Sequence, residues 1–225
     1  METAKRELTF LLAGPERRLL RGMAARLPAW IVPDHLTLLG VLGAFGSAAG
    51  YWLSGRHPGW LWLASAMVAV NWFGDSMDGT TARVRKIERP KYGYYLDHMV
   101  DGIITAAIGA SIGLSPFVRL DVALVLVVVY LVLSINLYLE AEVFGVFEMG
   151  YGVFGPTEVR LLIILANTGL WAGLTWSDLS VPAVARIADW VFLGAAALMT
   201  VTFLLRFRIN LIRLSRQEPP RRPGA

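Results

Sequence analysis

Four aspartates lie close together in a chain that is otherwise strongly apolar: Asp75, Asp78, Asp97 and Asp101. Hard divalent cations such as Mg²⁺, Mn²⁺ and Ca²⁺ prefer carboxylate oxygens as ligands. The chain has no cysteine, so nothing in it indicates a softer metal. The cluster therefore predicts a divalent-metal site, although a proton relay or an ion pathway would also place carboxylates in apolar helices.

The spacing of these residues is helical. One group recurs at offsets of 3, 4, 7 and 8 residues and a second group recurs every fourth residue, so each group occupies one face of a helix. The first group is Asp75, Asp78, Gly79, Ala82 and Arg83, and the second is Gly93, Asp97 and Asp101.

Both expected helices are otherwise apolar, which makes bare carboxylates costly. One Asp at the centre of a membrane helix costs about 2.5–3.5 kcal/mol, so four would cost roughly 10 kcal/mol. Arg83 alone carries too little charge to offset four acids. Divalent cations are the simplest source of the missing positive charge.

The rest of the chain predicts an all-α integral membrane protein. Of its 225 residues, 56% are apolar, and six segments have the length of a bilayer crossing. These segments are 36–53, 60–84, 92–114, 120–139, 159–175 and 187–205. We expect three parts: an interfacial helix within 1–32, a six-helix catalytic domain over 33–206, and a basic, partly disordered tail over 207–225.

The N-terminal part mixes Arg and Lys with Leu, Phe and Met, with a break near Gly14-Pro15. This composition favours an amphipathic helix lying on the membrane surface, and the alternative is a solvated basic tail. Glu140 and Glu142 are interpreted as solvated residues at the membrane interface.

Lys and Arg are distributed unevenly between the loops. The N-terminal part, the 83–91 linker and the C-terminal tail hold most of them, and the 54–59, 115–119 and 176–186 loops hold one each. By the positive-inside rule, both termini and the aspartate-bearing helix ends should face the cytoplasm. Because the basic residues flank apolar spans, nucleic-acid binding is not expected.

The signature Asp75-x-x-Asp78-Gly79-x-x-Ala82-Arg83, followed after nine residues by Gly93-x-x-x-Asp97-x-x-x-Asp101, resembles that of the CDP-alcohol phosphotransferase family. The resemblance implies a membrane enzyme of phospholipid biosynthesis, in a bacterial cell membrane, that uses a CDP-linked donor and a hydroxyl acceptor and releases CMP. It also implies a homodimer formed through membrane helices.

The resemblance further implies roles for the motif residues. Asp75, Asp78 and Asp97 would bind Mg²⁺ or Mn²⁺, with two ions expected, and Asp101 would be the general base that also touches the second ion. The remaining motif residues, with the first three aspartates, would contact the CDP moiety; they are Gly79, Ala82, Arg83 and Gly93. For the glycines alone, close helix packing is the competing explanation.

Two features bear on the substrates. His98 after Asp97, and Gly155-Pro156-Thr157-Glu158, resemble elements of the choline/ethanolamine branch of the family. They favour transfer of a phospho-alcohol from a small CDP-alcohol to a lipid hydroxyl. The alternative is phosphatidyl transfer from CDP-diacylglycerol to a small polar alcohol such as inositol phosphate, glycerol phosphate or serine.

Three side chains have open roles. His98 could replace Asp101 as the base or make only a structural hydrogen bond. Glu158 could orient the acceptor or be an ordinary acid at a helix start. Arg160 could bind an acceptor phosphate, pair with Glu158, or extend toward the membrane surface. A divalent-cation transporter is a remote alternative, and it predicts carboxylates near the midplane on broken helices.

Overall fold

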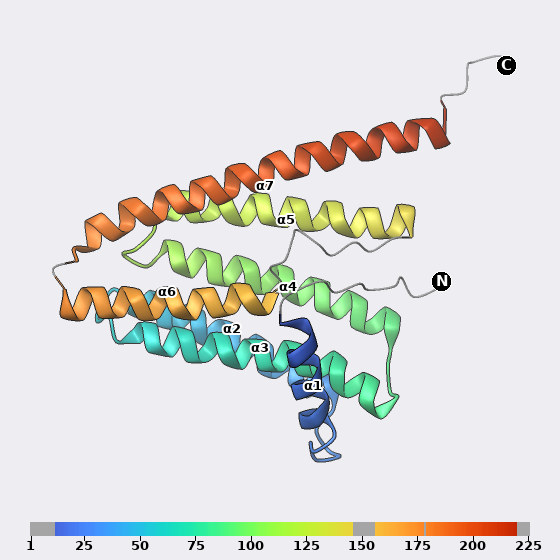
Figure 1. The fold of residues 1–225 in the computed structure, drawn as a ribbon, viewed down its shortest axis with the longest axis horizontal. Helices are drawn as coiled ribbons and strands as arrows, with labels where there is room; N and C mark the ends of the chain where they lie inside the picture. Colours follow the sequence, from blue (N-terminus) through green and yellow to red (C-terminus); the bar gives the residue numbers. More distant parts are fainter. Residues whose placement is uncertain (1–11, 146–155, 178, 220–225) are drawn as a thin grey trace.

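The computed structural model describes residues 12–145, 156–177 and 179–219, and this part of the chain contains helices and no strand. The all-helical prediction is therefore confirmed. The helices are α1 (Ala13–Ala24), α2 (Pro33–Leu53), α3 (Trp60–Arg85), α4 (Pro90–Gly113), α5 (Leu120–Phe144), α6 (Pro156–Trp176) and α7 (Val181–Gln217). The six long helices run alongside one another, and α1 runs across them (Figure 1).

Each of the six predicted apolar segments is matched by one long helix. Pro33, Pro90 and Pro156 each occupy the first position of a helix. Proline suits this position because its fixed φ is helical and the N–H that it lacks would have no partner within the helix. The 54–59 and 115–119 loops lie at one end of the bundle, and the α3–α4 linker lies at the other (Figure 1).

α7 is much longer than the predicted segment 187–205, and it continues to Gln217. Residues 206–217 contain neither Gly nor Pro, and the helix ends shortly before Pro219, whose predecessor is disfavoured in helical conformation. Residues 207–217 of the predicted 207–225 tail are therefore helical. The last six residues of that tail lie outside the described part.

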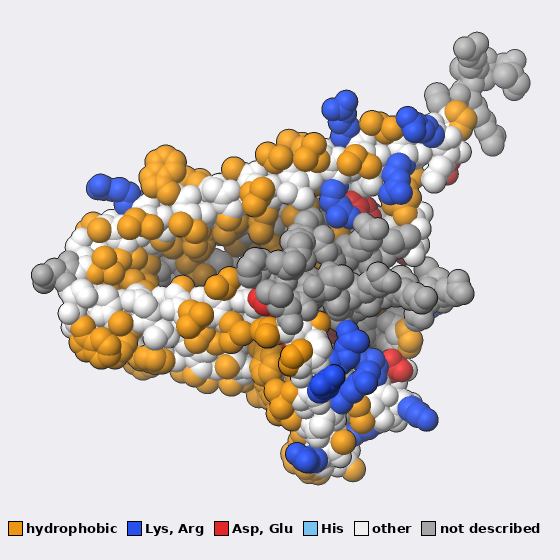
Figure 2. Space-filling model, in the orientation of Figure 1, with side chains coloured by type: hydrophobic (Ala, Val, Ile, Leu, Met, Phe, Trp, Pro, Cys, Tyr) orange, Lys and Arg blue, Asp and Glu red, His pale blue; other side chains and the backbone are white. Residues whose placement is uncertain are grey.

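Large apolar side chains cover much of the outer surface (Figure 2). Trp190, Leu198 and Leu165 are 72%, 69% and 65% exposed. A surface of this kind is unfavourable in water and is typical of a lipid-facing protein. In the described part, α2, α5, α6 and α7 are long and apolar enough to cross a membrane.

That α3 and α4 also cross the membrane stays a prediction, because their acidic and basic residues make them less apolar than the four helices named above. Their 26 and 24 residues are long enough. At a rise of about 1.5 Å per residue, each helix extends over roughly 36–39 Å, against about 30 Å for the hydrocarbon core.

α2 and α3 approach each other very closely, through glycines. A Cβ atom added at Gly74 would lie 2.3 Å from the backbone nitrogen of Gly40, and one added at Gly43 would lie 2.5 Å from that of Asn71. The Asn71 side-chain amide also donates to the Gly40 carbonyl oxygen at 3.0 Å. Small residues at such contacts let membrane helices pack backbone against backbone.

α1 docks on the bundle through one apolar face. Leu20 and Ala24 are buried against Leu36 of α2 and Met77 of α3. Arg17, Arg18 and Arg21 of the same helix are exposed, and basic side chains gather around α1 and along the C-terminal half of α7 (Figure 2). Residues 1–11 of the predicted interfacial region lie outside the described part, and its position on the membrane stays a prediction.

The interpretation of Glu140 as a solvated residue is wrong. Glu140 is 8% exposed and forms an ion pair with Arg206 of α7. It also accepts hydrogen bonds from Asn210 at 2.6 Å and from Asn136 at 2.5 Å. A buried carboxylate needs such partners, and α7 supplies two of them from a position 66–70 residues further along the chain.

Candidate active site

The four motif aspartates line a single small cavity between α2, α3 and α4. Asp75 and Asp78 come from α3, and Asp97 and Asp101 come from α4. The expectation that two helices direct these carboxylates toward one space therefore agrees with the geometry. The other lining residues are Thr37, Gly40, Asn71, Val100 and Ile104.

A second, larger cavity adjoins the first, and Thr37, Asp78 and Asp97 line both. The small motif residues Gly79, Ala82 and Gly93 line only the second cavity. Its remaining lining residues are Pro33, Asp34, Ile87, Arg89, Tyr92 and Leu96.

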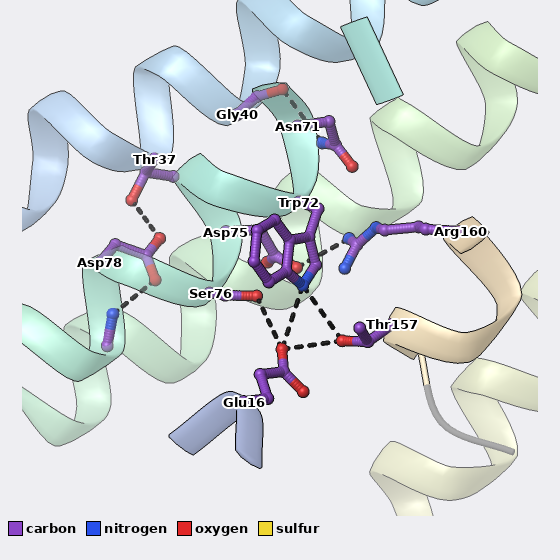
Figure 3. A network of polar contacts seen from close by, with 11 residues as sticks. Glu16, Thr37, Gly40, Asn71, Trp72, Asp75, Ser76, Asp78, Thr157 and Arg160 are labelled. Atoms are coloured by element: carbon purple, nitrogen blue, oxygen red, sulfur yellow. Dashed lines mark hydrogen bonds and ion pairs between the residues drawn. The ribbon is translucent and has the colours of Figure 1, made fainter. Parts of the chain in front are cut away.

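Asp78 is the most enclosed of the four aspartates, with 7% of its surface exposed. Thr37 of α2 donates a hydrogen bond to its Oδ2 atom at 2.7 Å, and the backbone N–H of Gly79 donates to its Oδ1 atom at 2.5 Å (Figure 3). These two donors offset part of the cost of burying the carboxylate. Thr37 therefore orients this carboxylate.

Asp75 forms an ion pair with Arg160 of α6, with 2.7 Å between Oδ2 and Nη2 (Figure 3). The Arg160 side chain is 20% exposed, and the contact joins residues 85 positions apart. The sequence left open an ion pair between Arg160 and Glu158. The ion pair of Arg160 described here is with Asp75 instead. Arg160 is thereby brought to the edge of the aspartate cavity.

Glu158 is 7% exposed and accepts a hydrogen bond from the backbone N–H of Leu12 at 2.8 Å. The N–H groups at the start of a helix have no partner within the helix, so Glu158 helps to complete the start of α1. Gly155 of the same sequence element lies outside the described residues.

His98 is not among the residues that line either cavity. Its Nδ1 atom lies 2.7 Å from the Tyr94 carbonyl oxygen. Its ring centroid lies 4.1 Å from that of Tyr94 and 4.2 Å from that of Tyr138 on α5. This environment matches the structural alternative for His98, in which it makes a hydrogen bond and packs between α4 and α5.

Arg83 is also not among the lining residues of either cavity. Its Nη2 atom donates to Thr80 Oγ1 at 3.2 Å, and its guanidinium lies beside Gly79, where a Cβ atom would be 3.1 Å from Nη1. An arginine side chain can rotate from this position, and a phosphate would be an alternative partner.

Sequence reasoning missed a polar group at the mouth of the second cavity. Arg89 forms an ion pair with Asp34, and its guanidinium lies 3.8 Å from the ring centroid of Tyr92. Tyr92 Oη donates to Asp34 at 3.3 Å. The Asp34 carboxylate raises the pKa of Arg89 above its usual range, so Arg89 stays charged. The basic 83–91 linker was the only sequence signal for this group.

The donor set around the first cavity fits a hard divalent cation, because it consists of carboxylates on two rigid helices. In the described part of the chain, no three acidic or histidine side chains converge closely enough to hold one ion. Two of the four carboxylates are instead turned toward protein donors, Asp75 toward Arg160 and Asp78 toward Thr37.

Comparison with known proteins places this geometry in context. A family profile described as CDP-alcohol phosphatidyltransferase matches residues 30–202. Archaetidylinositol phosphate synthase of Methanothermobacter thermautotrophicus is 32% identical over 154 residues, which cover 68% of this chain and 72% of that protein. The synthase of the same name from Pyrococcus horikoshii is 28% identical over 138 residues, which cover 61% of this chain and 69% of that protein.

Phosphatidylinositol phosphate synthase of Cutibacterium acnes is 36% identical over 91 residues, which cover 40% of this chain and 41% of that protein. Among solved structures, Mycobacterium tuberculosis phosphatidylinositol phosphate synthase with CDP-DAG bound is similar in fold. The TM-score is 0.57 at 22% identity, over 85% of this chain and 92% of that chain.

Proposed function

Because the chain belongs to the CDP-alcohol phosphatidyltransferase family, as its aspartate signature predicted, we propose that it transfers a phosphatidyl-type group from a CDP-linked lipid to a small polar alcohol. CMP is the second product. The relatives are named for products that contain inositol phosphate. Inositol phosphate is therefore the acceptor that we propose first for this chain.

This proposal rests on one observation: the motif residues line two adjoining cavities. Four carboxylates line one cavity, and the small residues Gly79, Ala82 and Gly93 line the adjoining one. A CDP-linked donor has a diphosphate next to a nucleoside. The two cavities offer a wall of carboxylates that suits cations for the first part, and a wall that includes the small residues Gly79, Ala82 and Gly93 for the second.

This proposal reverses the preference for a small CDP-alcohol donor that Asp97-His98 and residues 155–158 suggested. The relatives named above favour the phosphatidyl-transfer alternative. His98, one of the two features behind that preference, lines neither cavity and packs between Tyr94 and Tyr138. The unbroken course of α3 and α4 also differs from the broken helices expected of a cation transporter.

Asp75, Asp78 and Asp97 are the residues that we propose as ligands of two Mg²⁺ or Mn²⁺ ions, with Asp101 contacting the second. When bound, such ions neutralise diphosphate oxygens and stabilise the departing CMP. Thr37 keeps the Asp78 carboxylate directed into the space that both cavities share.

Asp101 is the proposed general base. The acceptor oxygen attacks the β-phosphorus of the donor, the bond from that phosphorus to the CMP oxygen breaks, and Asp101 takes the proton of the acceptor hydroxyl. Arg160 lies at the cavity edge through its contact with Asp75. Its planar guanidinium can bind an acceptor phosphate with two hydrogen bonds.

Six membrane spans, cytoplasmic termini, a cytoplasmic site and a homodimer complete the proposal. The α3–α4 linker, which carries Arg89, and the far end of α7 lie at the same end of the bundle (Figure 1). The concentration of Lys and Arg at that end supports a cytoplasmic orientation.

The test of this function is a panel of donors and acceptors with protein purified in detergent and Mg²⁺. We expect CMP release with CDP-diacylglycerol and inositol phosphate at least about tenfold faster than with CDP-choline and diacylglycerol. EDTA should stop the release. CMP should be measured together with the mass of the lipid product, and glycerol phosphate and serine complete the acceptor arms. CMP release with CDP-choline alone would contradict the donor assignment. No CMP release with any donor–acceptor pair would contradict the proposed function.

Gly93→Ala separates helix packing from ligand approach as the reason for this glycine. A Cβ atom at Gly93 would have no neighbour within 4 Å, so the variant should fold with an unchanged or slightly higher melting temperature. A methyl forced into a tight contact with the nucleotide costs about 1–3 kcal/mol, which predicts a KM for the CDP-linked donor raised roughly 5- to 150-fold. A lower melting temperature with an unchanged donor KM would show that packing is the reason.

A further inference from the structure

The Glu16 carboxylate of α1 lies where three helices meet (Figure 3). Its Oε1 atom accepts hydrogen bonds from Thr157 Oγ1 of α6 at 2.7 Å and from Trp72 Nε1 of α3 at 3.0 Å. Ser76 Oγ lies 3.5 Å from the same oxygen, at the outer limit of a hydrogen bond. One oxygen therefore joins α1 to both α3 and α6.

The contact between α1 and α6 is reciprocal. Glu16 accepts from Thr157 in the first turn of α6, and Glu158 accepts from the Leu12 backbone N–H at the start of α1. These bonds join residues 141 and 146 positions apart in the chain. Together they hold the starts of the two helices against each other.

The same helix turns carry the Asp75–Arg160 pair. Arg160 follows Thr157 by three residues, and Asp75 lies directly before Ser76 and three residues after Trp72. Residues three apart on a helix lie on neighbouring parts of its surface. Any movement of the start of α6 away from α3 therefore also moves Arg160 relative to Asp75.

We propose that Glu16 is a positioning residue for the acceptor side of the active site. By holding the first turn of α6 on α3, it fixes Arg160 at the edge of the aspartate cavity, where the acceptor phosphate binds. This inference rests on the proposed function, because Arg160 acts on the acceptor only if the chain is the transferase described above.

The apolar face of α1 supplies an independent means of attachment. Leu20 and Ala24, about one and two turns along α1 from Glu16, hold the helix on Leu36 and Met77. Loss of the Glu16 contacts should therefore leave α1 attached and loosen the start of α6, which still contacts α3 through the Trp72 Nε1–Thr157 Oγ1 hydrogen bond at 3.1 Å and the Asp75–Arg160 pair. This separation allows a positioning role to be distinguished from a role in stability alone.

The experiment compares Glu16→Ala with Glu16→Gln. Because both well-formed bonds end on Oε1, the Gln amide oxygen can replace it, and E16Q should keep acceptor KM within twofold of the wild type. E16A should raise the KM for inositol phosphate about tenfold and leave the KM for CDP-diacylglycerol unchanged. In an Arg160→Gln background, E16A should have little further effect, because Arg160 is the residue through which Glu16 acts.

Leu20→Ala is the matched control for loosened docking of α1, and it should lower the melting temperature without a selective change in acceptor KM. Hydrogen exchange of residues 156–165 gives a readout that does not depend on turnover, and exchange should accelerate in E16A but not in E16Q. Equal acceptor KM in E16A and wild type, equal effects of E16A and E16Q, or unchanged exchange would each overturn the proposal. Absence of CMP release in the wild type would instead count against the proposed function, and the exchange arm would still test the contact.

Discussion

Asp78→Asn should lower CMP release by about 10³-fold, which corresponds to about 4 kcal/mol of lost transition-state stabilisation. Asp78 is 7% exposed and lines both cavities, so its charge lies at the point where the diphosphate and the cations would meet. Asparagine keeps one oxygen that can accept from Thr37, as Asp78 does at 2.7 Å, and loses only the acceptor for the Gly79 N–H. The variant should therefore still fold and fail mainly through its missing charge.

The measurement is CMP release over a range of Mg²⁺ or Mn²⁺ concentrations, together with Mn²⁺ binding followed by electron paramagnetic resonance. Asp121→Asn is the matched control, because Asp121 is 64% exposed and paired with Arg119. It should stay within twofold of the wild type. Turnover by Asp78→Asn at the wild-type rate would remove the carboxylate cavity from the mechanism.

Gly74→Ala should cause the largest loss of stability among the glycine-to-alanine changes in the described part of the chain. The new Cβ atom would lie 2.3 Å from Gly40 N, 2.5 Å from Leu36 O and 2.6 Å from Gly40 Cα. All three are backbone atoms, so no side chain can rotate away and the two helices must separate. Overpacking costs typically about 1–3 kcal/mol and more where nothing can yield.

Separation of α2 from α3 would also draw Thr37 away from Asp78, so activity should fall together with the melting temperature in detergent. Gly169→Ala is the control, since a Cβ atom on that helical glycine has no neighbour within 4 Å. It should leave the melting temperature unchanged or raise it, because Ala is the better helix former by about 1 kcal/mol. A Gly74→Ala protein as stable as Gly169→Ala would show that the α2–α3 contact is looser than described.

Local sequence pattern was sufficient for the helices and for the faces that carry the aspartates. The spacing of Asp75 and Asp78, and of Asp97 and Asp101, sets their direction on each helix, because a helix repeats every 3.6 residues whatever surrounds it. The apolar segments gave the approximate helix positions in the same way. The α7 boundary was missed because the end of a membrane span and the end of a helix are different properties, and residues 206–217 continue the helix outside the apolar stretch.

The partners of the charged side chains could be decided only by the tertiary structure. Asp75 with Arg160, Asp78 with Thr37, and Glu16 with Thr157 join residues 85, 41 and 141 positions apart. No periodicity within one helix indicates how another helix is rotated or displaced against it. That relation depends on close packing, here on backbone contact at glycines such as Gly74, and it determines which polar side chains meet.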